Sequence, residues 1–96
     1  MGEVVSISGR ITTDTSSQMR SSLGDALRSM PATVTIDLSQ VDYMDTSGLA
    51  TLIEAIRIAR KQHTELVLRG IQEQPRYLLK VTDLDRLVPI EEEAKP

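Results

Sequence analysis

The spacing of apolar residues changes several times along this chain, between the two-residue repeat of a strand and the longer repeat of a helix. In VVSISGRI the apolar residues alternate with polar ones, which predicts a strand over residues 4–11. The same alternation predicts a second strand in TVTIDLS, residues 33–39. A short apolar and β-branched run predicts a third strand at 65–71.

Helical spacing is found in the segments between and after these strands. We expect helices over 16–30 and 47–61, and a third that starts at Pro75 and breaks within 82–85. A capping box at residues 15–18 should begin the first of them. Four residues of this first helix are expected in the core: Met19, Leu23, Leu27 and Met30. Four residues of the second should lie opposite its apolar face: Thr51, Glu54, Arg57 and Lys61.

The alternation of strands and helices limits the possible folds. Strands joined through helices form right-handed crossovers, so they lie parallel in one sheet. The chain is therefore expected to be an α/β protein, with a small, mostly parallel β-sheet and α-helices packed on it. Its 96 residues suit one domain, over 4–90, followed by an acidic tail at 91–96 that should be solvated.

Composition excludes several classes of function. The net charge is -3 and the basic residues are scattered, so nucleic acid is not expected as a partner. There is no cysteine, and no apolar stretch approaches the length of a membrane span, so we expect a cytoplasmic protein without direct membrane insertion. No metal or other cofactor is predicted: Asp42 and Asp45 lie near each other, but no ligand set completes a cation site.

The turn between the second strand and the second helix, VDYMDTSGLATL at 41–52, is the main functional candidate. Asp45, Thr46 and Ser47 can cap the helix, and Gly48 permits a tight turn or the close approach of another chain. In parallel sheets functional atoms collect at such a place, beyond the carboxyl end of a strand. The same residues would also serve an ordinary, well-capped turn, and spacing alone does not separate these interpretations.

An enzyme is not expected. His63 is the single histidine, and Ser47 is not in a G-x-S-x-G elbow, which argues against a Ser-His-acid triad. The sequence shows no evident base beside Ser47 and therefore no catalytic residue. Any phosphoryl transfer to this serine would need machinery and ATP from another protein.

The segment VTIDLSQVDYMDTSGLATLIEAIRIARKQ resembles the core of STAS domains, the family of the anti-sigma factor antagonists. The resemblance runs from about Val5 to Ile90, and includes VVSISGRIT near the start and RYLLKVTDLDRLVPI near the end. It implies a STAS-like fold and a noncatalytic interaction module. In phosphorylatable members the serine before the glycine accepts phosphate from a partner serine kinase that is also the anti-sigma factor. Ser47 has that position here.

The resemblance also implies a partner-binding surface. Asp45 matches the usual acid of the motif, and Thr46, Ser47 and Gly48 complete it. Many antagonists have another acid after the first strand, where this chain has Ile11, Thr12 and Thr13, so the acid is missing or displaced to Asp14. We therefore expect Thr12 and Asp14 beside the four turn residues.

Two further expectations follow from the resemblance. The turn is also similar to that of the STAS adaptor subunit that binds the ATPase of bacterial lipid-trafficking ABC transporters, so this ATPase is the alternative partner. STAS domains usually have another strand before VVSISG. Its absence here suggests either a chain that begins unusually late or an open sheet edge, which could recruit a second copy and form a homodimer.

Overall fold

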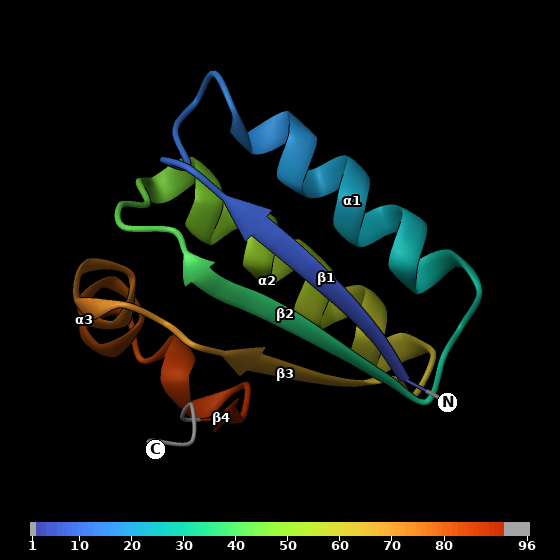
Figure 1. The fold of residues 1–96 in the computed structure, drawn as a ribbon. Coiled ribbons are helices and arrows are strands. Elements are labelled where there is room, and N and C mark those ends of the chain that lie inside the picture. The colour runs from blue at the N-terminus through green and yellow to red at the C-terminus, as the bar shows by residue number, and fades with distance from the viewer. Residues whose placement is uncertain (1, 92–96) are drawn as a thin grey trace, which may run out of the picture.

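The computed structural model describes residues 2–91 and confirms the α/β fold (Figure 1). Four strands form one sheet in the order β1-β2-β3-β4, and each neighbouring pair is parallel. The strands are β1 (Gly2–Ser8), β2 (Thr33–Gln40), β3 (Glu65–Arg69) and β4 (Ile90–Glu91). The helices are α1 (Ser16–Arg28), α2 (Thr46–Lys61) and α3 (Glu73–Val81), and a 3₁₀ turn, η1, spans Leu84–Arg86.

The core lies between one face of the sheet and helices α1 and α2. Alternate residues of the central strand β2, Val34, Ile36 and Leu38, are 0% exposed, whereas Thr33 and Thr35 on the other face are half-buried. Helix α1 packs on β1 and on α2, and α2 contacts β3 (Figure 1). The two-residue repeat therefore identified the buried face of the strand correctly.

The first strand is shorter than predicted. It ends at Ser8, and Gly9 then adopts a left-handed conformation with φ of 84°. Ile11 forms an isolated parallel bridge with Met44 instead of continuing the strand. The alternation persisted to residue 11 because Ile11 is buried against the turn before α2, not because the strand extends so far.

Two side-chain predictions on the helices are wrong. Met30 is 63% exposed, because α1 ends at Arg28 and Met30 itself has a φ of 53°, so the helical spacing no longer applies to it. Thr51 is only 2% exposed, since it lies beside α1 and its hydroxyl donates to the carbonyl of Ser47, 2.9 Å away. A threonine whose hydroxyl bonds to its own helix can be buried at little cost.

The two sides of the sheet end differently. On one side, β1 pairs with β2 alone within residues 2–91, so the predicted open edge is present, and the homodimer remains a prediction. On the other, β4 was not predicted as a strand and includes Glu91, the first residue of the predicted tail. The rest of that tail, 92–96, lies outside the described residues.

Within 2–91, no helix has both the length and the apolarity needed to span a membrane.

Candidate functional site

The turn between β2 and α2 brings the predicted site residues to the N-terminus of the longest helix. Asp45 is the N-cap residue of α2, and its carboxylate accepts a hydrogen bond of 2.8 Å from the backbone N–H of Ser47. Its carbonyl accepts from the N–H groups of Gly48 and Leu49. Two otherwise unpaired donors of the first turn, the N–H groups of Ser47 and Gly48, are therefore satisfied by Asp45, and the Leu49 N–H forms the first regular helical bond.

The hydroxyl of Ser47 also donates to Asp45 Oδ1, at 2.5 Å, so one carboxylate oxygen receives both groups of Ser47. This hydrogen bond lowers the pKa of Asp45, and the backbone N–H groups of Ser47, Gly48 and Thr13 lower it further, against a smaller opposing effect of desolvation. Ser47 is half-buried, and Thr46 beside it is exposed. Asp45 therefore orients the Ser47 hydroxyl, a contact that the sequence analysis did not predict.

Gly48 is required by packing. A Cβ atom at this position would lie 2.6 Å from Met44 Cγ and 2.7 Å from Ile11 Cγ2, closer than side chains tolerate. Both of these neighbours are almost completely buried, as is Gly48 itself. Gly48 therefore supports the predicted surface from beneath, by letting the first turn of α2 settle on Ile11 and Met44.

The loop after β1 reaches the same turn. The N–H of Ile11 donates to the carbonyl of Tyr43, and the N–H of Asp45 donates to the carbonyl of Ile11, each at 2.9 Å. These two bonds hold the loop against the start of α2, and half-buried Thr12 and exposed Asp14 follow Ile11 in the same loop. All six predicted site residues thus belong to two adjoining segments.

Thr15 does not form the predicted capping box. Its hydroxyl oxygen accepts from the N–H of Thr12 at 2.8 Å and donates to the carbonyl of Arg10 at 2.7 Å, and no side chain caps α1. The hydroxyl closes the loop that leads into the helix, so it is not available to the first turn.

Gln74 is a component of the site that the sequence did not reveal. Its side-chain Oε1 accepts from the N–H of Met44 at 2.8 Å, and its Nε2 donates to the carbonyl of Met44 at 2.9 Å. Thirty positions separate the two residues. The predicted third helix began after Gln74, and no local pattern marks a glutamine that bridges to a distant turn.

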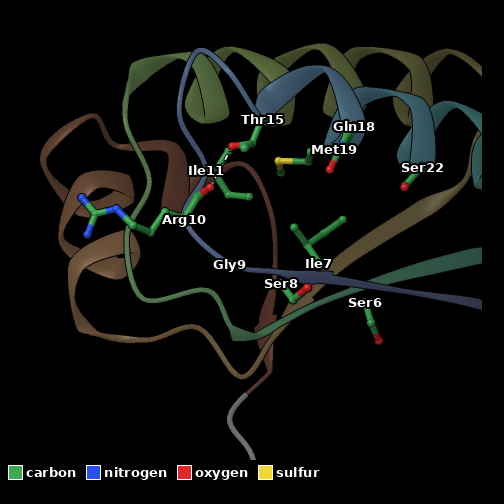
Figure 2. A pocket seen from close by; sticks show the side chains of 10 residues that line it. All are labelled: Ser6, Ile7, Ser8, Gly9, Arg10, Ile11, Thr15, Gln18, Met19 and Ser22. Atoms are coloured by element: carbon green, nitrogen blue, oxygen red, sulfur yellow. Dashed lines mark hydrogen bonds between the residues drawn. The ribbon is translucent and has the colours of Figure 1, made fainter.

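A hollow of about 250 Å³ lies on the other side of the loop, between β1 and the start of α1 (Figure 2). Ile7 and Met19 point into it from the strand and the helix, and Thr15, Gln18 and Ser22 line it from the side of α1. Ser6 and Ser8 also line it, but the Ser6 side chain points to the other face of the strand. The side chain of Arg10 points away, over the ring of Tyr43 at 4.4 Å. In residues 2–91 no buried side-chain polar atom lacks a hydrogen bond, and no cluster of possible metal ligands occurs. The hollow therefore has no evident ligand-binding group.

Comparison with known proteins places this geometry in a family. The model of the family described as "Mlab, STAS domain" matches residues 2–89. The chain is 36% identical to the anti-sigma-B factor antagonist of Listeria monocytogenes over 55 residues, which are 57% of this chain and 48% of that protein. It therefore spans about half the length of that relative.

A second relative is matched over more of its length. The intermembrane phospholipid transport system binding protein MlaB of Escherichia coli is 30% identical over 83 residues, 86% of this chain and 82% of that protein. Among solved structures, an anti-sigma factor antagonist from Mycobacterium paratuberculosis superimposes with a TM-score of 0.84 at 26% identity, covering 93% of this chain and 75% of the other. Both kinds of relative named in the sequence analysis are thus found.

Proposed function

The chain belongs to the STAS domain family, and we propose that it is a cytoplasmic, noncatalytic interaction module of the anti-sigma factor antagonist type, switched by phosphorylation at Ser47. The partner would be an anti-sigma factor serine kinase. The arrangement of Ser47 supports this proposal most directly: its hydroxyl lies at the N-terminus of α2, half-buried, next to an exposed Thr46 and a loop that carries Asp14.

The proposed modification has a simple balance. The Oγ atom of Ser47 forms a bond to the γ-phosphorus of ATP, the bond from that phosphorus to the bridging oxygen breaks, ADP leaves, and the hydroxyl proton is released. The kinase provides the nucleotide. This chain provides the nucleophile, oriented by its hydrogen bond to Asp45.

Phosphorylation would change the surface by a large amount of charge. A phosphoserine adds roughly -1.5 to -2 charges at neutral pH. A partner group within about 4 Å then experiences roughly 1–4 kcal/mol per charge pair. That corresponds to about tenfold to several hundredfold in affinity, which is enough to release one partner in favour of another.

The MlaB match supports a second candidate, a constitutive adaptor that binds the ATPase of a lipid-trafficking ABC transporter. That match covers a larger share of both chains than the match to the Listeria antagonist does. In this case the same turn would form a permanent contact, and Ser47 would act only as the hydrogen-bond partner of the capping residue Asp45.

One experiment tests the two candidates together. The purified chain is incubated with ATP and each anti-sigma kinase of its own organism, and separately with the ATPase subunit of the lipid transporter. The antagonist predicts a mass gain of one phosphate on the Ser47 peptide, binding that weakens in Ser47→Asp, and a Ser47→Ala variant that binds but is not modified. Thr46→Ala removes the neighbouring hydroxyl and is the matched control, because it should still be modified.

The opposite outcome identifies the adaptor. Stable binding to the ATPase without modification, equal for Ser47→Asp and wild type, would replace the switch by the adaptor. Phosphate found in the Ser47→Ala variant would move the modification to another residue.

A further inference from the structure

We propose that Asp45 makes the start of α2 sensitive to phosphorylation: phosphate on Ser47 would expel the Asp45 carboxylate from its capping position. This inference rests on the proposed modification of Ser47 and specifies how the start of α2 changes when Ser47 is modified. The sequence suggested only that a helix N-terminus accommodates an added anion. The structure shows that another anion already occupies this place.

The argument begins with the double role of Asp45 Oδ1, which accepts from the backbone N–H of Ser47 and from its hydroxyl. Phosphorylation replaces the hydroxyl proton by phosphorus. The hydrogen-bond donor is lost, and a negatively charged group remains bonded to the oxygen that lay 2.5 Å from the carboxylate. An attractive contact thereby becomes a repulsive contact between like charges.

The phosphate can take over the vacated position. Its oxygens are strong acceptors, and the first-turn N–H groups together with the helix dipole favour an anion there. The backbone of Asp45 need not move, because its own N–H is bonded to the carbonyl of Ile11 and its carbonyl to Gly48 and Leu49. The expected change is therefore a rotation of the Asp45 side chain away from the turn.

The test needs no kinase, because phosphoserine can be incorporated at position 47 during translation. Four proteins are compared: wild type and Asp45→Asn, each with serine or phosphoserine at position 47. Asparagine is as good an N-cap as aspartate but carries no charge, so it retains the cap and removes the repulsion. Phosphorylation should change the thermal midpoint in both proteins, and the midpoint of wild type should fall by roughly 4–8 °C relative to the change seen in Asp45→Asn.

The side-chain angle χ1 of Asp45, measured from scalar couplings by nuclear magnetic resonance, provides a local readout. Phosphorylation of wild type should change this angle, because the carboxylate leaves its position beside Ser47. Equal midpoint shifts in both backgrounds, or an unchanged Asp45 χ1 in phosphorylated wild type, would overturn the inference. Asp45→Ser, a second uncharged cap, repeats the comparison if Asp45→Asn does not fold.

The result is separable from the proposed function. A chain that no anti-sigma kinase binds would still show the different midpoint shifts if Asp45 acts as inferred. Conversely, a confirmed switch with equal midpoint shifts would retain the proposed function and reject the role of Asp45.

Discussion

The two long helices of this protein begin in opposite ways. At the start of α1, Thr15 occupies the N-cap position, but its hydroxyl is bonded to Arg10 and Thr12 in the preceding loop. At the start of α2, the side chain of Asp45 turns forward and binds the backbone and hydroxyl of Ser47. The Thr15 hydroxyl thus bonds within its own preceding loop, whereas the Asp45 side chain bonds to the first turn of the helix that it caps.

This difference shows that a capping residue does not by itself define a site. Both segments have residues that favour helix starts, and both helices form at nearly the predicted positions. Only the second start combines a carboxylate, a hydroxyl and support from other parts of the chain, namely Ile11, Met44 and Gln74. Changes at the second start should therefore cost more than equivalent changes in α1.

The largest contrast is expected between the two helical glycines. Gly48→Ala introduces a Cβ that overlaps Met44 and Ile11, so we expect a loss of about 1–3 kcal/mol in the free energy of unfolding, as for other overpacked cores. Gly24→Ala in α1 is the matched control. No atom lies within 4 Å of its added Cβ, so the gain in helix propensity should stabilise the protein by about 0.8–1.0 kcal/mol.

Urea denaturation followed by circular dichroism measures both glycine variants. The opposite signs are the essential result, since the chemical change is identical. A Gly48→Ala protein as stable as wild type would show that the close packing of the turn on Ile11 and Met44 does not require glycine at position 48.

A smaller contrast is expected between the groups that support the two starts. Gln74→Leu removes both hydrogen bonds to the Met44 backbone and should lower the free energy of unfolding by about 1–3 kcal/mol, at roughly 0.5–1.5 kcal/mol for each bond. Thr15→Val, nearly the same shape, removes the two bonds of the first loop with a comparable loss. Gln74→Leu should weaken partner binding more than Thr15→Val does, measured by titration calorimetry, because four of the six predicted contact residues lie on the turn that Gln74 supports.

These variants test whether the turn before α2 acts as one unit. Equal partner affinity for both would show that Gln74 contributes stability alone. Weakened binding in Thr15→Val and not in Gln74→Leu would place the sensitive contact in the loop after β1.

The fold and the centre of the site could be predicted because they depend on local patterns. The two-residue and helical repeats record which face of each element is buried, and D-T-S-G marks the helix start directly. The incorrect predictions concern choices made by distant atoms. Thr15 had the spacing of a cap but bonds to its loop, Thr51 looked polar but lies beside α1, and Met30 follows a helix that has already ended.

Gln74 and β4 were also missed, because local sequence patterns do not report contacts with distant residues. A glutamine that binds the Met44 backbone across thirty positions, and a strand of two residues that exists by pairing with β3, have no local period to detect. The part of the site that the sequence missed is the part supplied by α3. Such support becomes visible only when the elements are assembled.

The smallest expected effect is the pH dependence of the α2 cap. The pKa of Asp45 is lower in the folded protein than in the unfolded chain, first because of the hydrogen bond from the Ser47 hydroxyl. Its stabilising contribution is therefore fully present above the ordinary aspartate pKa of about 3.9, and is lost as the pH falls through the lower folded value. The stability difference between wild type and Asp45→Asn should accordingly shrink as the pH is reduced from 6 toward 3.

Asp37 makes this measurement more informative. The hydroxyl and N–H of Ser39, together with Arg69, lower the pKa of Asp37, so its contribution has the same sign and remains in Asp45→Asn. The acid loss of stability should thus be reduced in either single variant and smallest in Asp37→Asn/Asp45→Asn. If the free energy of unfolding of Asp45→Asn fell with pH as steeply as that of wild type, the Asp45 carboxylate would be no more stabilised in the folded protein than in the unfolded chain. The contrast between the two helix starts would then be steric and not electrostatic.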